Sequence, residues 1–332
     1  MDLKNFVTKT QEFINCDVKD SKHIAFACTE NYICFAGITL TSVLLSNKGK
    51  FTFHIFADKC ADNDLDKLNI TAQNHKCNVF IHYVNNDIFN QSKDPGQFSL
   101  ASYYRMIMPV FLEKYTDKFL YLDSDVGVYG DISYLWNVDT KGICAVVMPI
   151  QDKRHVNEGK RVGVDRYFCS GVMLINIAEW NEENISIKAL KKSREDIKYP
   201  YPDQDILNIL LQDKEIFVDN KYQYQYSMSY LMDHSDKPSL EKCPEDITIL
   251  HYTGASKPWH SWVKTLDAAK KYVEVKQQSA WNNMPLVEPQ TYKQIHKAAR
   301  LAKKEGSLKD IIYWYYKYAV AKIKYMMGGK AK

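Results

Sequence analysis

Runs of apolar residues alternate with polar segments through the first half of the chain. The runs His23–Cys28, Phe51–Ala57 and Cys77–Val84 are short and rich in aromatic and branched residues, which predicts buried strands. Between them, the apolar segment Tyr32–Leu45 and the polar segment Asp62–His75 have the length and composition of helices. This alternation predicts an α/β, Rossmann-like fold with a mostly parallel, helix-flanked sheet that binds ligands at the carboxyl ends of its strands.

The pattern then leads to a fourth strand and becomes less regular. We expect Ser99–Leu112 to be helical until Pro109, and Lys118–Leu122 to be a strand. In the second half, Tyr167–Asn176 predicts a glycine-containing strand or strand pair, and the apolar run before His251 predicts a strand that ends there.

The remaining pattern is helical. A short helix is expected at Tyr201–Leu211, and helices from Trp262 onward. We therefore predict a helical extension over residues 1–22, a single catalytic domain over 23–285, and a helical tail over 286–332.

Composition adds a charge asymmetry to this picture. The chain has 332 residues, of which 45% are hydrophobic and 25% charged, enough for a substantial core. From Thr291 onward there are 11 Lys or Arg residues and two acidic residues, whereas the preceding part holds 33 basic and 38 acidic residues. A mildly acidic body therefore carries a strongly basic tail.

The cysteines indicate a reducing compartment. Eight cysteines are scattered without a Cys-x-x-Cys pair or a Cys/His cluster, which favours reduced thiols in the cytosol and argues against a structural zinc site. The longest mostly apolar stretch, Tyr32–Leu45, is too short to span a bilayer.

Candidate chemistry begins with Asp-x-Asp, which occurs four times, starting at Asp62, Asp64, Asp123 and Asp203. The first two lie in a polar helical segment, where a solvated face is the better interpretation. Asp123 and Asp125 follow an apolar strand. Alternate residues of an extended segment point the same way, so both carboxylates are able to face one Mg²⁺ or Mn²⁺ ion. The pattern alone is equally typical of a turn.

Neighbouring segments favour the metal site. The chain lacks a glycine-rich phosphate-binding loop after its first strand, so a metal would have to neutralise a bound diphosphate. "HYTGASKPWH" places His251 at a strand end, followed by Gly254, where backbone can approach a ligand, and by Lys257, which can pair with phosphate. Arg105 is a further candidate phosphate partner, and its alternative interpretation is an ordinary surface arginine.

Six ordered motifs resemble family 8 of the retaining glycosyltransferases. They are "FACTENY", "SYYRMIMP", "YLDSDV", "YFCSGVMLINI", "DQDILN" and "HYTGASKPWH". Within that family, the chain is most similar to the bacterial hexosyltransferases that extend the lipopolysaccharide core. The resemblance implies a GT-A type nucleotide-sugar-binding domain, a UDP-hexose donor (UDP-glucose or UDP-galactose) and a divalent cation, Mn²⁺ or Mg²⁺.

The resemblance also implies roles for individual residues. The metal ligands would be Asp123, Asp125 and His251. The donor would lie against Ala27, Thr29, Asn31, Tyr32, Arg105, Ser124, Cys169, Gly171, Gly254 and Lys257. The catalytic residues would be Asp203, Gln204 and Asp205, with Gln204 beneath the anomeric carbon. Thr29 and Cys169 depart from the family pattern, which usually has Asp and Asn there.

These residues suggest a mechanism. Retention needs a covalent intermediate or attack from the face that the leaving group occupies. A glutamine amide is a weak nucleophile, so we expect Gln204 to stabilise an oxocarbenium-like centre during same-face attack, with the diphosphate accepting the proton of the acceptor.

Ser307–Met327 combines isoleucines and aromatic residues with lysines. This pattern suits a helix on an anionic membrane surface, which implies a peripheral protein on the inner face of a bacterial inner membrane with a lipopolysaccharide core acceptor. The alternative is a helix packed on the catalytic body. Nucleic acid is not expected as a partner. Two other functions remain open: a membrane-associated scaffold without catalysis, and a phosphohydrolase of the haloacid dehalogenase kind.

Overall fold

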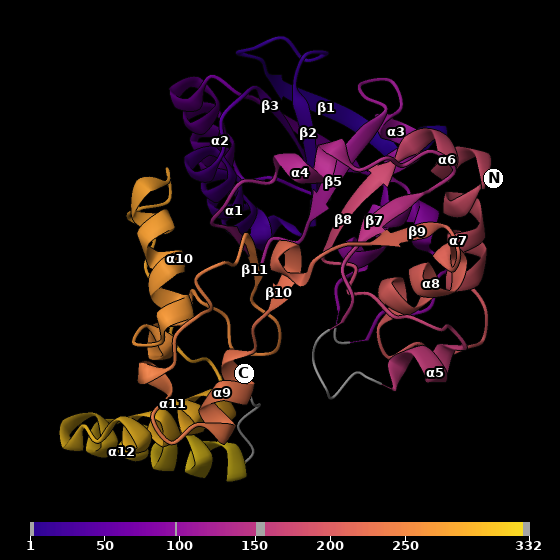
Figure 1. Cartoon of the computed structure of the whole chain (residues 1–332). Helices are drawn as coiled ribbons and strands as arrows, with labels where there is room; N and C mark the ends of the chain where they lie inside the picture. Colours follow the sequence, from indigo (N-terminus) through magenta and orange to yellow (C-terminus); the bar gives the residue numbers. More distant parts are fainter. Residues whose placement is uncertain (1–2, 97, 151–156, 328–332) are drawn as a thin grey trace. The chain divides into compact units, whose positions relative to one another are not determined.

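The computed structural model describes residues 3–96, 98–150 and 157–327, and it divides into two compact units (Figure 1). The first unit consists of Met1–Gln225, Ile247–His251 and Ser279–Trp281. The second unit consists of Tyr226–Asp246, Tyr252–Gln278 and Asn282–Lys332. Two short later segments, Ile247–His251 and Ser279–Trp281, therefore belong to the first unit although most of the chain around them belongs to the second.

The main sheet of the first unit has eight strands among the described residues, in the order β1-β4-β3-β2-β5-β8-β7-β9. Their bounds are β1 (Val7–Phe13), β2 (Lys22–Cys28), β3 (Phe51–Ala57), β4 (Asn78–Val84), β5 (Lys118–Leu122), β7 (Ala145–Val147), β8 (Val172–Asn176) and β9 (Glu215–Phe217). Strands β4, β3, β2 and β5 are parallel neighbours, as are β7 and β9, whereas β1–β4, β5–β8 and β7–β8 are antiparallel. The sheet is mixed, with the predicted parallel strands adjacent to one another.

A smaller sheet has the order β10-β11-β6. Its strands are β6 (Val126–Val128), β10 (Tyr224–Gln225) and β11 (Ile249–His251). Strand β6 follows β5 after the turn at residues 123–125, so this turn joins the two sheets.

Helices cover the main sheet because its central strands are buried on both faces: all seven residues of β3 are buried. The helices of the first unit are α1 (Ile33–Ser46), α2 (Asp62–His75), α3 (Met108–Leu112), α4 (Ser133–Asn137), α5 (Glu158–Val162), α6 (Ile177–Glu182), α7 (Ile185–Ser193) and α8 (Pro202–Leu211). Figure 1 shows α1 and α2 on one side of the sheet and α6 and α7 on the other. The predicted helices at 32–45 and 62–75 are thereby confirmed.

Two local predictions were wrong, and a third was right only in part. Residues 1–22, predicted helical, contain β1, which pairs with the edge of β4. Pro109 does not end a helix but occupies the first turn of α3, where its missing N–H costs no hydrogen bond; the preceding segment is a 3₁₀-helix, η4 (Leu100–Met106). The strand predicted at Tyr167–Asn176 is present but shorter, because β8 begins only at Val172.

The acidic residues of α2 also differ from one another. Asp62 and Asp66 are exposed, as a solvated face requires. Asp64, in contrast, accepts a hydrogen bond of 2.7 Å from Nε1 of Trp281. The indole ring of Trp281 packs against Gly37 of α1, where a Cβ would lie 2.1 Å from the ring. Trp281 thus anchors a late segment of the chain to α1 and α2.

A ladder of three buried histidines crosses the main sheet. Nδ1 of His23 lies 2.9 Å from Nε2 of His54, and Nδ1 of His54 lies 2.9 Å from Nε2 of His82. The carbonyl of Val18 ends the ladder on one side, and the hydroxyl of Thr10 ends it on the other. The carbonyl accepts only, so Nε2 of His23 donates to it, and each following imidazole then donates through Nε2. The ladder is fully hydrogen-bonded when all three rings are neutral.

The second unit is helical among its described residues. Its α-helices are α9 (Met228–His234), α10 (Asp267–Gln278), α11 (Tyr292–Glu305) and α12 (Leu308–Met326). Gly306, at φ +79°, ends α11, and the hydroxyl of Ser307 caps the start of α12. The two helices form a hairpin in which the rings of His296 and Tyr318 stack at 4.4 Å.

The other face of α12 is exposed and apolar. Its exposed side chains are Leu308, Ile312, Tyr313, Tyr316, Val320, Ile323 and Met326. Tyr325 is also exposed, but its ring lies 4.7 Å from that of Tyr292 on α11. Lys309, Lys317 and Lys324 are exposed beside them. No helix in the described part of the chain is both long and apolar enough to cross a membrane. The boundaries predicted at residues 22/23 and 285/286 remain predictions.

Candidate active site

Two strand pairings bring together the residues of the candidate site. Strand β5 ends at Leu122, and the backbone N–H of Asp123 donates to the carbonyl of Gly171 at 2.8 Å, continuing the pairing of β5 with β8. After the turn, Val126 of β6 pairs with His251 of β11. The turn between the two sheets therefore carries both aspartates, and the antiparallel partner of β6 supplies the histidine.

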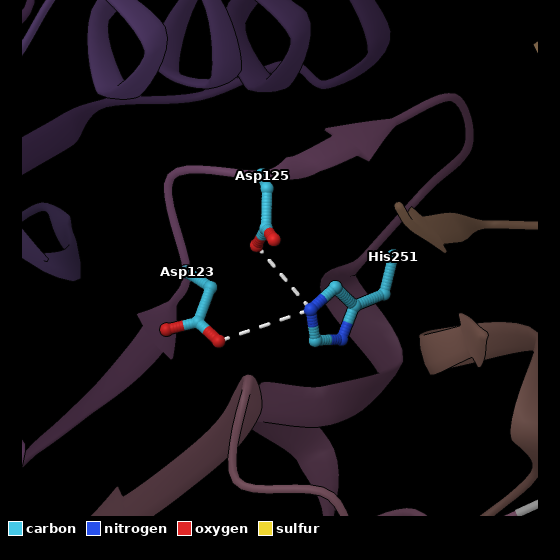
Figure 2. Close-up of side chains that lie close together, drawn as sticks. All are labelled: Asp123, Asp125 and His251. Carbon is cyan, nitrogen blue, oxygen red and sulfur yellow. Dashed lines mark ion pairs between the residues drawn. The ribbon is translucent and has the colours of Figure 1, made fainter. Parts of the chain in front are cut away.

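Asp123, Asp125 and His251 form one compact group (Figure 2). Nε2 of His251 lies 3.3 Å from Oδ1 of Asp125 and 3.8 Å from Oδ2 of Asp123. One ligand atom from each residue lies within 4.8 Å of the other two. The structure thus groups the three residues that the sequence predicts as metal ligands.

The electrostatics of this group favour a positive charge at its centre. Burial by itself lowers the pKa of an imidazole, but the carboxylate of Asp125 outweighs this effect and raises the pKa of His251 to about 10. At neutral pH the imidazole is therefore protonated in the absence of another cation. The two carboxylates therefore face a positive charge in both cases: the protonated imidazole of His251, or a bound cation.

Gly171 leaves the space that this arrangement requires. A Cβ at this position would lie 2.3 Å from Cε1 of His251 and 2.7 Å from Oδ2 of Asp123. Any larger residue would displace one of the two side chains. The predicted contact of Gly171 with the donor is untested, but its position against the aspartate and histidine explains why a glycine stands here.

The group fits a divalent cation. Two carboxylates and one imidazole are a donor set suited to Mn²⁺, and carboxylate oxygens also suit Mg²⁺. Because Gly171 has no Cβ, its own side chain does not intrude between Asp123 and His251. Asp123, Asp125 and His251 are thus the residues that would hold the ion.

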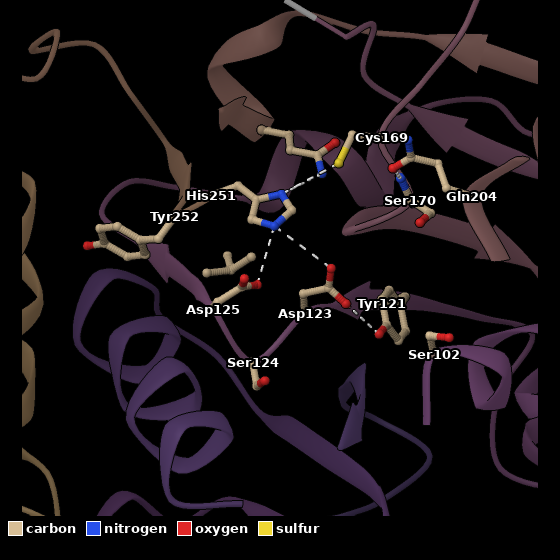
Figure 3. A network of polar contacts seen from close by, with 12 residues as sticks. Ser102, Tyr121, Asp123, Ser124, Asp125, Cys169, Ser170, Gln204, His251 and Tyr252 are labelled. Atoms are coloured by element: carbon tan, nitrogen blue, oxygen red, sulfur yellow. Dashed lines mark hydrogen bonds and ion pairs between the residues drawn. The ribbon is translucent and has the colours of Figure 1, made fainter. Parts of the chain in front are cut away.

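Arg105 lies in the protein interior rather than on the surface. Its Nη2 lies 2.8 Å from Oδ1 of Asp123, and its Nε lies 3.2 Å from Oδ2 of Asp203. Its Nη1 donates to the carbonyl of Ser170 at 2.8 Å. The hydroxyl of Tyr121 also donates to Oδ1 of Asp123, at 2.7 Å (Figure 3). The alternative interpretation as a surface arginine was therefore wrong.

This arrangement assigns Arg105 a structural contact that the sequence did not predict. Its guanidinium connects η4 with the turn after β5 and with α8. Burial raises the pKa of Asp203, and the adjacent guanidinium opposes this effect. Contact between Arg105 and a phosphate remains a prediction.

Gln204 is held at the start of α8 by two hydrogen bonds. Its Oε1 accepts from the backbone N–H of Ser170 at 3.2 Å, and its Nε2 donates to the hydroxyl of Tyr167 at 3.0 Å. The same hydroxyl donates to the carboxylate of Asp205. Asp205 is fully buried and also pairs with Arg161 at 2.6 Å. Arg161 and Tyr167 therefore occupy the carboxylate of Asp205, while Ser170 and Tyr167 orient the amide of Gln204.

The predicted nucleotide contacts gather at the end of β2. Because β2 pairs in parallel with β5, its carboxyl end lies beside the end that carries Asp123. Half-buried Ala27 lies on β2, Thr29 precedes the 3₁₀-helix η2 (Glu30–Tyr32), and Asn31 and Tyr32 are exposed. The carbonyl of Ser124 is fixed by the hydroxyl of Thr39 at 3.1 Å. Contact of these residues with a nucleotide is untested.

Gly254 and Lys257 belong to the second unit. Gly254 has a φ of +83°, a backbone conformation that disfavours residues with a side chain. Nζ of Lys257 donates to the carbonyl of Tyr252 at 2.7 Å. Their predicted contact with a diphosphate stays a prediction.

Sequence reasoning missed three residues of the site. Tyr167 and Ser170 lie inside the motif "YFCSGVMLINI". Their polar side chains within this motif could have indicated that they belong to the site. Gln223 had no such signal. It lies in the 3₁₀-helix η6 (Asn220–Gln223), and its Nε2 is 3.2 Å from Nδ1 of His251. The thiol of Cys169 is buried 3.7 Å from the same nitrogen (Figure 3).

Solved structures share the fold. The galactosyltransferase LgtC, solved in complex with donor and acceptor sugar analogs, matches with a TM-score of 0.64 and 22% identity, over 77% of this chain and 96% of that one. The glycosyltransferase GlyE of Streptococcus pneumoniae matches with a TM-score of 0.57 and 21% identity, over 79% and 63% of the two chains. The predicted GT-A type α/β fold is thereby confirmed.

Sequence relatives agree with the family resemblance. The lipopolysaccharide glucosyltransferase WaaO of Escherichia coli is 32% identical over 91% of both chains. A lipopolysaccharide 1,3-galactosyltransferase of Salmonella typhimurium is 31% identical over 85% of both. The descriptions "Glycosyl transferase family 8" and "Glycosyl transferase family 8 C-terminal" match residues 23–263 and 268–322. The chain therefore belongs to glycosyl transferase family 8.

Proposed function

We propose that this protein transfers glucose or galactose, with retention, from a UDP-sugar to the lipopolysaccharide core, forming an α linkage. The observation that carries the proposal is the Asp123–Asp125–His251 group in a chain of this family. Relatives named as lipopolysaccharide glucosyl- and galactosyltransferases support the two donors and the acceptor class.

The chain's own residues prepare the site for a negatively charged donor. Asp123, Asp125 and His251 would hold a divalent cation, which would supply Lewis-acid stabilisation of the leaving diphosphate when bound. Arg105 and Tyr121 fix Oδ1 of Asp123, which leaves Oδ2 facing His251. Lys257 adds positive charge for the diphosphate.

Gln204 acts at the sugar. Its amide is a poor nucleophile, and Ser170 and Tyr167 hold it in one orientation. It stabilises positive charge that develops at the anomeric carbon as the bond to the diphosphate oxygen breaks. The acceptor hydroxyl attacks from the same face, its oxygen forms the new bond to that carbon, and its proton passes to the departing diphosphate.

Asp205 is not the nucleophile in this mechanism. Its carboxylate is fully buried and bonded to Arg161 and Tyr167, so attack would require breaking an internal ion pair. Mass spectrometry of the unmodified enzyme after incubation with donor alone tests this point. A covalent hexose on Gln204 or Asp205 would contradict same-face attack.

The exposed face of α12 supports peripheral attachment to an anionic membrane. The apolar stripe is bordered by lysines and lies on the side of the hairpin away from α11. This placement would hold the enzyme at the inner face of the inner membrane, beside a lipid-linked acceptor.

Two alternatives are weaker. Family membership argues against a phosphohydrolase of the haloacid dehalogenase kind. The intact ligand group argues against a scaffold without catalysis.

Release of UDP tests the proposal. Purified protein is incubated with Mn²⁺ and UDP-glucose, UDP-galactose or their N-acetyl forms, with and without truncated lipopolysaccharide. We expect one hexose to be turned over when lipopolysaccharide is present, and Asp125→Asn to lose at least about 100-fold in rate because a ligand is lost. Absence of turnover with every donor would favour the scaffold.

A further inference from the structure

Gln223 is a buried glutamine against the candidate metal ligand His251. Its side chain is fully buried, and it directly precedes β10, whose Gln225 pairs with His251 of β11. Nε2 of Gln223 lies 3.2 Å from Nδ1 of His251. Oε1 of the same amide is buried and has no hydrogen-bond partner among the described residues. A buried amide oxygen left in this way costs free energy.

An amide whose Nε2 faces Nδ1 of His251 conflicts with metal binding. An N–H that donates to Nδ1 requires a neutral imidazole with its hydrogen on Nε2. Nε2 is the nitrogen that faces Asp125 and Asp123, at 3.3 and 3.8 Å. A hydrogen there would occupy the lone pair that a cation needs.

Rotation of the amide by 180° removes both problems, because the oxygen and nitrogen of a glutamine exchange places within the same shape. Oε1 would then accept a hydrogen bond from Nδ1–H, which gives the unpartnered oxygen a donor. The imidazole would carry its hydrogen on Nδ1 and direct the lone pair of Nε2 toward the two carboxylates.

We infer that Gln223 is a positioning residue that holds His251 in its metal-binding tautomer. The inference rests on the metal site of the proposed function. Cys169 also reaches Nδ1, but at 3.7 Å, and a thiol is a weak acceptor. The amide oxygen is therefore the better partner, and ligating histidines usually have one of this kind on their other nitrogen.

Titration of the full-length protein with Mn²⁺ in the presence of UDP, followed by the electron paramagnetic resonance signal of the free ion, tests this inference without reference to turnover. Gln223→Leu removes the acceptor and should raise the Mn²⁺ Kd by about 10- to 100-fold. Gln223→Glu keeps an acceptor oxygen of the same reach and should stay within about threefold of the wild type. Gln223→Met keeps the length of the side chain without an oxygen, so it replaces the leucine variant if that variant does not fold.

Gln225→Leu is the matched control. It removes the same type of side chain two residues away, where the amide nitrogen has no hydrogen-bond partner in the described part of the chain. Its Mn²⁺ affinity should equal that of the wild type. Melting of all variants in EDTA separates folding from metal binding.

The outcomes of this titration test the role of Gln223 separately from the existence of the metal site. Wild-type affinity in both Gln223→Leu and Gln223→Met, or equal losses in Gln223→Glu and Gln223→Leu, would overturn the role of Gln223 and leave the metal site intact. A wild-type protein that does not bind Mn²⁺ would overturn the metal site and this inference with it. Loss in the leucine variant with retention in the glutamate variant would support both.

Discussion

Nη2 of Arg105 lies 2.8 Å from Oδ1 of Asp123, so a buried guanidinium holds one aspartate of the candidate metal site. The same guanidinium reaches Asp203 at 3.2 Å. Two carboxylates from distant parts of the chain therefore depend on one cation, which explains how acidic residues can gather in this part of the protein before any substrate binds.

Replacement of Arg105 should destabilise the fold. Arg105→Leu leaves Asp203 buried without its cation and should lower the free energy of unfolding by about 3 kcal/mol, measured by urea denaturation in EDTA. Lys50→Leu, which breaks the exposed pair with Asp20, is the control and should not shift the midpoint. A change below about 1 kcal/mol for Arg105→Leu would show that the buried pair is weak.

Removal of the Tyr167 hydroxyl should slow catalysis through Gln204. Tyr167→Phe deletes the group that accepts from Nε2 of Gln204 and donates to Asp205. We expect kcat to fall about tenfold, the value of roughly one hydrogen bond, with little change in KM for the donor.

Two comparisons test this explanation. In a Gln204→Ala background, Tyr167→Phe should have little further effect, because the group that it orients is gone. Tyr104→Phe, which deletes a hydroxyl bonded to Asn86 instead, should keep wild-type kcat. Equal losses from Tyr167→Phe in both backgrounds would argue against positioning.

The histidine ladder should make stability depend on pH. Burial lowers the pKa of His23 and His54, and lowers that of His82 to about 3; the positive charge of Lys114 adds to the effect at His54 and His82. The unfolded chain takes up protons below about pH 6.5, whereas the folded ladder does not. The stabilisation is therefore complete above about pH 6.5 and is lost as the pH falls toward the folded pKa values.

A conservative variant isolates this effect. His82→Gln keeps groups able to bond to His54 and Thr10 but cannot take up a proton. Between pH 6 and pH 5, the free energy of unfolding should fall by about 1.4 kcal/mol per pH unit less than in the wild type. Parallel pH profiles for the two proteins would mean that His82 is protonated in the folded state.

The exposed face of α12 should control binding to lipid vesicles. Ile312 is 70% exposed and Ile323 is 57% exposed, so Ile312→Ser with Ile323→Ser removes apolar area without touching the face that packs on α11. Cosedimentation with vesicles that contain an anionic lipid should weaken at least about tenfold, and high salt should weaken wild-type binding.

The control for the tail is Ile70→Ser, an exposed isoleucine on α2. It should bind vesicles as the wild type does. Undiminished binding by the double variant would instead assign attachment to another part of the chain.

Prediction from the sequence succeeded where a local pattern determines the structure. The aromatic and branched residues of β3 and the polar composition of α2 are enough to place both elements. The ligand group was predictable because Asp123 directly follows an apolar run, Asp125 lies two residues further on, and His251 ends another apolar run.

Prediction failed where a distant partner decides the outcome. Val7–Phe13 is a strand because the edge of β4 offers it a ladder of hydrogen bonds, which its own polar residues do not indicate. The burial of Arg105 and the contact of Gln223 depend on strand pairings between segments far apart in the sequence. No pattern within one segment contains that information.

The turn between the two sheets has a consequence for the newly made chain. Asp125 is synthesised 126 residues before His251, and Trp281 follows later still. A growing chain that has reached only Gln225 possesses both aspartates but lacks β11, the strand between β10 and β6. It therefore cannot assemble the small sheet, and the group of Asp123, Asp125 and His251 forms only after β11 has been synthesised.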